Sequence, residues 1–229
     1  AYISPGTNAV DMNPTSGIDT IRSMGVSDAL IIKVNGNLTP ANTAFYQWGF
    51  TIGNSNYNNI AALAVRGNNV FVSGTTYGST TLKTEFDPSA DSALIAGVSS
   101  TTDRDMFLAM YDATKLPSDT SFYRWAFIMG STTVNENLYS MATDTSGNIY
   151  LGGVATASFD CDPSSKANFV SGSNSSMFVV KYNITTVPSD TNFYKWNFTP
   201  GTFSGSYPTG LQVKNNKLSI AGLFYGNFK

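Results

Sequence analysis

The chain has 229 residues, of which 41% are hydrophobic and only 12% are charged, and its formal net charge is −2. This composition can bury a core, but it offers no basic patch for nucleic acid or for a membrane surface, and no run approaches the ~18 apolar residues of a membrane span. We therefore expect neither a nucleic-acid partner nor membrane insertion.

Histidine is absent and Cys161 is the one cysteine. A Ser-His-Asp or Cys-His catalytic system and a His-ligated zinc or iron site are therefore impossible, and so is an internal disulfide. Without a His to activate it, Cys161 is expected to be a small buried or half-buried hydrophobe and not a nucleophile. The sequence predicts a protein that is not an enzyme, with no catalytic and no cofactor-binding residues.

Residues 1–53 carry three markers that recur later in the chain. These are the turn sequence Asp11-Met12-Asn13-Pro14, the apolar run 29–35 and the aromatic sequence Phe45-Tyr46-Gln47-Trp48. The run and the aromatic sequence read as two β-strands, which we call strands C and D. This part is predicted to be a half unit that holds only C and D.

Residues 54–130 are predicted to form a full four-stranded unit. An apolar strand A at 60–65 and an alternating strand B at 70–75 flank Arg66-Gly67-Asn68-Asn69, which is typical of a hairpin turn. Strands C and D follow at 106–111 and 122–128, after a Ser/Thr/Gly-rich stretch that we expect to be a loop or a small extra hairpin.

Residues 131–200 repeat the full unit and residues 201–229 repeat only A and B, so strands follow the phase CD-ABCD-ABCD-AB. The period is about 75 residues, and no window shows helical spacing with caps. The equivalent sequences include Phe122-Tyr123-Arg124-Trp125, Phe193-Tyr194-Lys195-Trp196, Glu85-Phe86-Asp87-Pro88 and Asp160-Cys161-Asp162-Pro163.

Four-stranded antiparallel units repeated end to end indicate an all-β, β-propeller-like fold. We predict a single repeat domain over 1–229, with Trp48, Trp125 and Trp196 at equivalent buried positions. The strand sequence 142–153, the Phe-Asp-x-Asp-Pro turn at 159–163 and Met-Phe-Val-Val-Lys-Tyr at 177–182 resemble the SBBP-type β-propeller repeats. That resemblance implies a secreted or surface protein and says little about activity.

The acid pairs before proline have two interpretations. Glu85, Asp87, Asp160 and Asp162 could bind Ca²⁺, but the sequence lacks the downstream Glu of an EF-type loop. We favour turns in which the carboxylates accept hydrogen bonds from nearby backbone N–H groups. No cofactor is expected, with Ca²⁺ as the open alternative, and the lysines of the apolar runs are expected on an exposed edge rather than in a reactive site.

Four sequons fit the N-x-[ST] glycosylation pattern. They begin at Asn37, Asn174, Asn183 and Asn197. Asn37 and Asn183 occupy corresponding connections between strands C and D, so we expect these two to be modified first in a glycosylating host.

Low charge, abundant Ser, Thr and Asn, and half units at both ends favour a non-catalytic extracellular or cell-surface scaffold that assembles with copies of itself into a layer or fibre. The alternative is a propeller binding module for a glycan or protein ligand within a larger secreted protein. A propeller enzyme that uses Asp19, Asp103 or Asp105 is the minority hypothesis. The half units at the ends could also meet within one chain, but a ring of three blades would be strained.

Overall fold

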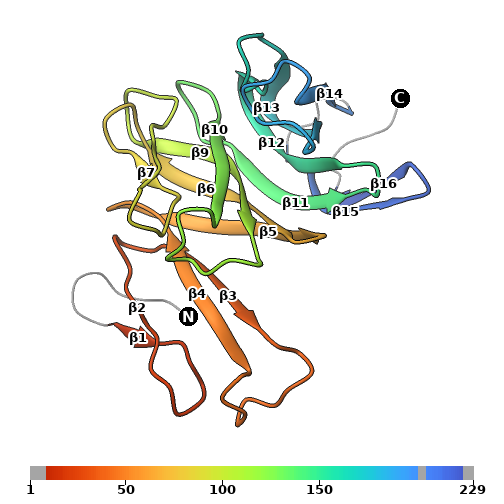
Figure 1. Ribbon diagram of the computed structural model, residues 1–229. Helices are drawn as coiled ribbons and strands as arrows, with labels where there is room; N and C mark the ends of the chain where they lie inside the picture. The colour runs from red at the N-terminus through yellow and green to blue at the C-terminus, as the bar shows by residue number, and fades with distance from the viewer. Residues whose placement is uncertain (1–8, 201–204, 224–229) are drawn as a thin grey trace.

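A computed structural model describes residues 9–200 and 205–223, and these residues form antiparallel β-sheets and no α-helix (Figure 1). The predicted all-β class is therefore confirmed for the described part of the chain. No helix there is long and apolar enough to cross a membrane.

The first part of the chain forms two separate hairpins. Strands β1 (Val10–Asp11) and β2 (Thr20–Ile21) pair with each other, and β3 (Ala29–Val34) pairs with β4 (Tyr46–Ile52). We call the β3–β4 pair sheet 1. It contains the predicted strands C and D.

Sheet 2 contains β5 (Asn58–Arg66), β6 (Asn69–Gly78), β9 (Asp103–Asp112) and β10 (Tyr123–Met129), in the spatial order β10-β9-β6-β5. The extra hairpin expected between strands B and C is present as β7 (Thr84–Glu85) and β8 (Leu94–Ile95).

Sheet 3 has the same order of strands A to D, with β11 (Asn137–Thr143), β12 (Asn148–Asp160), β13 (Phe169–Asn183) and β14 (Tyr194–Phe198). Its central strands are longer, because Phe159 and Asp160 continue the pairing that forms the separate hairpin in sheet 2. Sheet 4 is the final pair, β15 (Tyr207–Lys214) and β16 (Lys217–Leu223).

The pairing of the two central strands has the same register in both four-stranded sheets. Val70 lies opposite Tyr111 in sheet 2, and Ile149 lies opposite Tyr182 in sheet 3. Since these residues are also equivalent in the sequence repeat, the strand alignment deduced from the sequence is correct at the level of single residue pairs.

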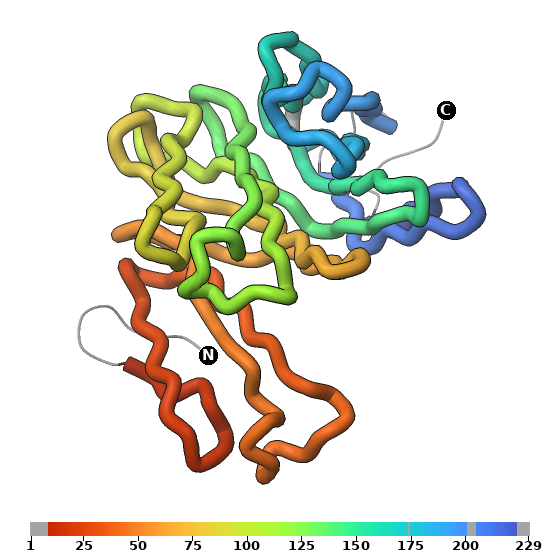
Figure 2. Tube along the Cα trace, viewed as in Figure 1, coloured from red at the N-terminus to blue at the C-terminus, as the bar shows by residue number. Residues whose placement is uncertain are grey.

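The hydrophobic core lies between sheets rather than within one. One cluster joins Trp48 and Phe50 of sheet 1 to Phe107 and Phe122 of sheet 2, and the other joins sheet 2 to sheet 3 through side chains such as Trp125. Burial of an apolar face against the next sheet is the main force that holds such an array together. Figure 2 shows sheets 1 and 4, drawn in orange and blue, on different sides of the molecule.

The prediction of three equivalently buried tryptophans is wrong for one of them. Trp48 and Trp125 are buried, but Trp196 keeps 36% of its surface exposed. Trp48 and Trp125 each pack against a phenylalanine of the following sheet, whereas Trp196 contacts Tyr150 and Phe198 of its own sheet. The difference arises because no aromatic ring of a following sheet reaches Trp196 among the described residues.

Candidate functional site

The acid–proline turns use their carboxylates to hold the backbone. Glu85 Oε1 accepts hydrogen bonds from the backbone N–H groups of Asp87 at 3.0 Å and Ala93 at 2.6 Å. Asp160 Oδ1 does the same with Asp162 at 3.0 Å and Asn168 at 2.9 Å. This is the turn interpretation favoured from the sequence.

The second acid of each pair continues the turn. Asp87 accepts a bond from the N–H of Ser89, and Asp162 accepts bonds from the N–H of Ser164 and the amide of Asn168. Within the described ranges, no group of three or more His, Cys, Asp and Glu side chains is arranged to hold a metal ion. The four candidate Ca²⁺ ligands thus hold the turns, and Ca²⁺ binding stays the untested alternative.

Each of these turns is also fixed to the strand C that follows it. The buried hydroxyl of Tyr111 donates to the carbonyl of Phe86 at 2.9 Å, and that of Tyr182 donates to the carbonyl of Cys161 at 2.7 Å. Cys161 is fully buried and unpaired, and burial raises the pKa of its thiol to about 12. It is therefore buried, as predicted, and the raised pKa disfavours the thiolate form.

The two lysines of the apolar runs cover aromatic rings. Lys33 donates to the carbonyl of Ala113 at 2.8 Å, and its ammonium lies 5.7 Å from the centre of the Trp48 ring. Lys181 lies 5.2 Å from the Tyr150 ring and 6.0 Å from that of Trp196. Both side chains are half-buried, Lys33 on the edge strand β3 and Lys181 on the central strand β13, and cation–π attraction replaces part of their hydration.

A buried acid pair between sheets 2 and 3 was not recognised as a pair in the sequence. Asp105 on β9 and Glu136 before β11 are both fully buried, and both carboxyl groups border Gly130. Asp105 Oδ2 accepts the N–H of Val98 at 2.8 Å and Glu136 Oε2 accepts that of Ser131 at 3.1 Å. The other oxygen of each carboxyl has no hydrogen-bond partner among the described residues.

Burial of this pair makes ionisation unfavourable. Desolvation, opposed by the bond from Val98 and reinforced by the charges of Asp103 and Glu136, raises the pKa of Asp105 to about 7. Desolvation also raises the pKa of Glu136. Neither carboxyl group is exposed to solvent in the structure.

The equivalent contact between sheets 1 and 2 shows the structural role of the Asp105–Glu136 pair. There Asp28 faces Asn58, whose amide Nδ2 donates to the Asp28 carboxylate at 3.2 Å. Asp28 precedes β3 as Asp105 precedes Met106, and Asn58 occupies the place of Glu136 before strand A. A polar pair thus links adjacent sheets in both cases, but of the two aspartates only Asp28 accepts a hydrogen bond from a side-chain amide.

Replacing Glu136 with Gln should therefore raise stability at pH 8. The Gln amide can donate to Asp105 as Asn58 does to Asp28, and one buried charge is removed. In the unchanged protein, the raised pKa of Asp105 makes its contribution to stability fully present below about pH 4 and lost as pH rises through about 7, and the raised pKa of Glu136 acts in the same direction. We expect E136Q to raise the thermal midpoint by several degrees at pH 8, at roughly 2–4 °C per kcal/mol, with a smaller gain at pH 5.

The exposed substitution D91N is the matched control for this experiment, because Asp91 lies on the surface and its change should leave the midpoint nearly constant. Thermal unfolding followed by circular dichroism at both pH values gives the comparison. An E136Q protein that melts below the unchanged protein at pH 8 would contradict this account of the acid pair.

The asparagine side chains of the sequons differ in their exposure and hydrogen bonding. Asn37 is exposed in the connection after β3, and Asn183 is half-buried at the end of β13, where its Oδ1 accepts bonds from Thr185. Asn197 turns its amide Nδ2 inward, toward the Tyr194 hydroxyl at 2.8 Å. The geometry favours Asn37 and disfavours Asn197; the side chain of Asn174 lies outside the described residues.

The remaining candidate site is formed by two free sheet edges. Strand β3 of sheet 1 has β4 as its one neighbour, and β16 of sheet 4 has only β15, within the described ranges. The equivalent central strands of sheets 2 and 3 have neighbours on both sides. An edge with unpaired N–H and C=O groups is a template for another strand.

Apolar side chains accompany both edges. Ile32 and Val34 are exposed on β3, as are Ile220 and Leu223 on β16. Exposed apolar side chains beside an open strand edge are typical of a surface that pairs with another chain.

The motifs that resemble SBBP-type repeats lie on β11, β12, β13 and the turn between the latter two. They define the strand pattern, and the resemblance remains an expectation drawn from those motifs. No protein-family model matches this chain, and no curated protein is significantly similar to it.

Proposed function

We propose that this protein is a non-catalytic structural scaffold whose copies join head to tail through sheets 1 and 4. The proposal includes the finer fold, a propeller-like series of four-stranded units in the permuted phase CD-ABCD-ABCD-AB. One observation carries it: among residues 9–200 and 205–223, the C/D hairpin of sheet 1 and the A/B hairpin of sheet 4 pair with no further strand. Together they contain the four strands of one complete unit.

A head-to-tail contact of this kind joins two different surfaces of the same protein. It therefore closes into a ring when the rotation between subunits allows closure, and otherwise continues as a fibre or layer. Each added subunit would complete one four-stranded sheet and satisfy the backbone groups of both edges.

An extracellular or cell-surface location is part of the proposal. It is supported by the low share of charged residues, 12%, and by the exposed sequon at Asn37. The 75 Ser, Thr and Asn residues also support it, because their side chains are uncharged and could carry glycans. We propose that this asparagine is the first to be glycosylated.

The binding-module alternative has one specific observation in its favour. A cleft of about 490 Å³ lies between Arg66, the turn at 143–145 and the turn at 213–216. Arg66 is already used there, since its guanidinium donates to the carbonyls of Asp144 at 2.9 Å and Thr145 at 2.8 Å. A glycan or protein ligand would have to bind beside these contacts.

The scaffold proposal is tested by the mass of native particles, measured by light scattering, before and after deletion of 211–229. We expect large particles from the unchanged protein and separate subunits from the deletion. The substitution I220K tests the same edge without removing chain, because a lysine on β16 should block strand addition. L116K, in an exposed loop of sheet 2, is its control. An unchanged protein that is always monomeric would overturn the proposal.

A further inference from the structure

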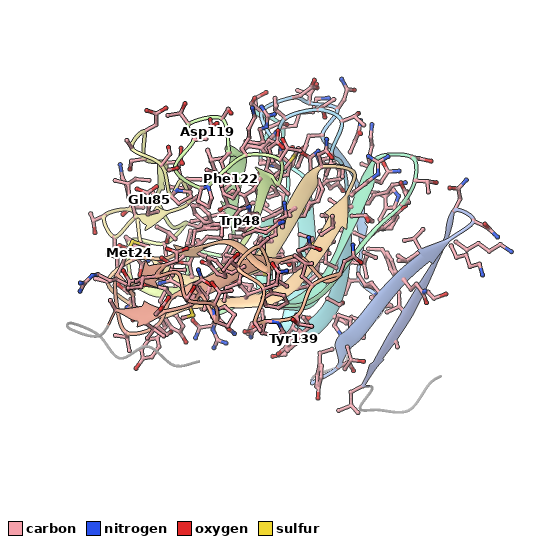
Figure 3. All side chains as sticks on the ribbon, turned by 60° about the horizontal axis from the view of Figure 1, so that its bottom comes forward. Met24, Trp48, Glu85, Asp119, Phe122 and Tyr139 are labelled. Carbon is pink, nitrogen blue, oxygen red and sulfur yellow. The ribbon has the colours of Figure 1, made fainter. Side chains whose placement is uncertain are left out.

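One aromatic contact recurs wherever two full C/D strand pairs follow each other. The Trp48 ring meets Phe122 of the next sheet edge to face, at 5.4 Å and 83°, and Trp125 meets Phe193 at 5.4 Å and 88°. Figure 3 labels Trp48 and Phe122 and shows them close together. The phenylalanine in each case is fully buried.

A second ring completes the socket for each phenylalanine. Phe50 lies 5.1 Å from Phe122, and Phe127 lies 5.7 Å from Phe193, both nearly perpendicular. Two aromatic side chains of strand D therefore hold the phenylalanine that begins strand D of the following unit. Such contacts contribute beyond the area that they bury.

The same two side chains are left open on β14. Trp196 and Phe198 occupy the positions of Trp125 and Phe127, and their exposed fractions are 36% and 38%. They lie 5.9 Å apart, compared with 6.3 Å for Trp125 and Phe127. The socket is thus formed, but no phenylalanine of the described residues fills it.

Phe45 is the equivalent phenylalanine of sheet 1, since it precedes β4 as Phe122 precedes β10 and Phe193 precedes β14. Its carbonyl accepts the N–H of Asn35 at 2.7 Å, as the carbonyl of Phe122 accepts that of Asp112 and the carbonyl of Phe193 accepts that of Asn183. Its own N–H donates to Asn42, three residues back, as in the other two connections. The backbone conformation of the three C–D connections is therefore shared at this point, but Phe45 is only half-buried.

The strand register that would bring these parts together is also fixed by the repeat. In sheets 2 and 3, the first residue of strand B lies opposite the last residue of strand C: Asn69 opposite Asp112, and Asn148 opposite Asn183. The equivalent residues of the open edges are Lys217 on β16 and Asn35 after β3. Counting along both strands places Ile220 opposite Ile32 and Leu223 opposite Ala29.

We propose that Phe45 of a second copy of this chain fills the socket of Trp196 and Phe198, while β3 of that copy pairs with β16 in this register. This inference rests on the proposed head-to-tail assembly and specifies its contact. A second copy is the occupant that fits, because the β3–β4 hairpin carries the missing phenylalanine, the missing strand pair and the matching apolar edge together. In the part of the chain that the structure describes, sheets 1 and 4 do not pair with each other.

The register is tested by mixing two variants, one carrying I32C and the other I220C, under conditions in which particles form. Directly opposite residues in antiparallel strands are within disulfide distance, whereas a shift of two residues moves them about 7–8 Å apart. We expect a covalent dimer on a non-reducing gel. The mixture of I32C with L218C is the control and should give at least tenfold less dimer. Cys161 can stay in place because its buried thiol is unreactive.

The socket is tested with F45A, which should weaken subunit association at least tenfold, since a central aromatic anchor typically contributes 2 kcal/mol or more to an interface. W196A should weaken it similarly. L116A, which removes an exposed side chain in another C–D connection, should leave association unchanged.

The outcomes separate this inference from the proposed function. An unchanged protein that does not assemble overturns the scaffold proposal and this inference with it. Assembly without the I32C–I220C dimer, or assembly unaffected by F45A, overturns only the inference. A doubly substituted I32C/I220C chain that forms its disulfide within a monomer would show closure inside one chain and would also overturn it.

Discussion

Replacing Phe122 with alanine is expected to destabilise the protein by about 3–5 kcal/mol. The ring is fully buried, meets Trp48 and Phe50 edge to face, and lies 5.2 Å from Tyr111. Its removal leaves a cavity between sheets 1 and 2, because rings anchored on β-strands cannot collapse into the space. Urea unfolding followed by tryptophan fluorescence gives the free energy of unfolding.

Two other phenylalanines provide the comparison for this experiment. F193A should lower the free energy of unfolding by about as much as F122A, since Phe193 fills the equivalent socket between sheets 2 and 3. F45A should cost much less when measured on the dissociated subunit, because Phe45 is only half-buried. Equal costs at Phe45 and Phe122 would show that the three positions are not related as we describe.

Replacing Gly74 with alanine is expected to cost about 3 kcal/mol or more. Gly74 lies in the centre of sheet 2 on β6, opposite a β-bulge at Ile60–Ala62 of β5. An added Cβ would overlap the backbone carbonyl of Asn59, which cannot move without breaking the pairing of the strands. Glycine is required here because two backbones approach closely, and thermal unfolding should show a large drop in the midpoint.

The same arrangement recurs in sheet 3, where a Cβ on Gly153 would meet the carbonyl of Asn137, so G153A should have a comparable effect. G36A is the matched control. Gly36 lies in an exposed turn with nothing within 4 Å of an added Cβ, so its change should be nearly neutral. A Gly74 variant as stable as the Gly36 variant would mean that the bulge relaxes easily.

The strands and their pairing could be predicted from the sequence because they depend on local signals that recur. Apolar runs such as 106–111, turns such as Arg66-Gly67-Asn68-Asn69 and the aromatic sequence before each strand D mark elements by residue type alone. Because these signals recur, the units can be aligned with one another residue by residue. The observed pairs Val70–Tyr111 and Ile149–Tyr182 agree with that alignment.

The candidate site could be predicted only in part. The acids before proline were correctly interpreted as turn residues, since that role needs only partners a few residues away. The sequon pattern predicts which asparagines can be glycosylated but not where their side chains point. Asn197 points its amide into the sheet through contacts with Tyr194 and Cys161, which the sequence pattern does not predict.

What the sequence by itself determined is the unit: four strands, their order, and the phenylalanine and tryptophan that begin strand D. What only the tertiary structure decided is which neighbour each unit has. Trp196 has the same sequence surroundings as Trp125, but it is exposed because burial between sheets depends on a following sheet, not on local sequence. Likewise, Asp105 and Glu136 become a costly buried pair only because two sheets bring residues from different units together, and it is chiefly their burial there that raises both pKa values.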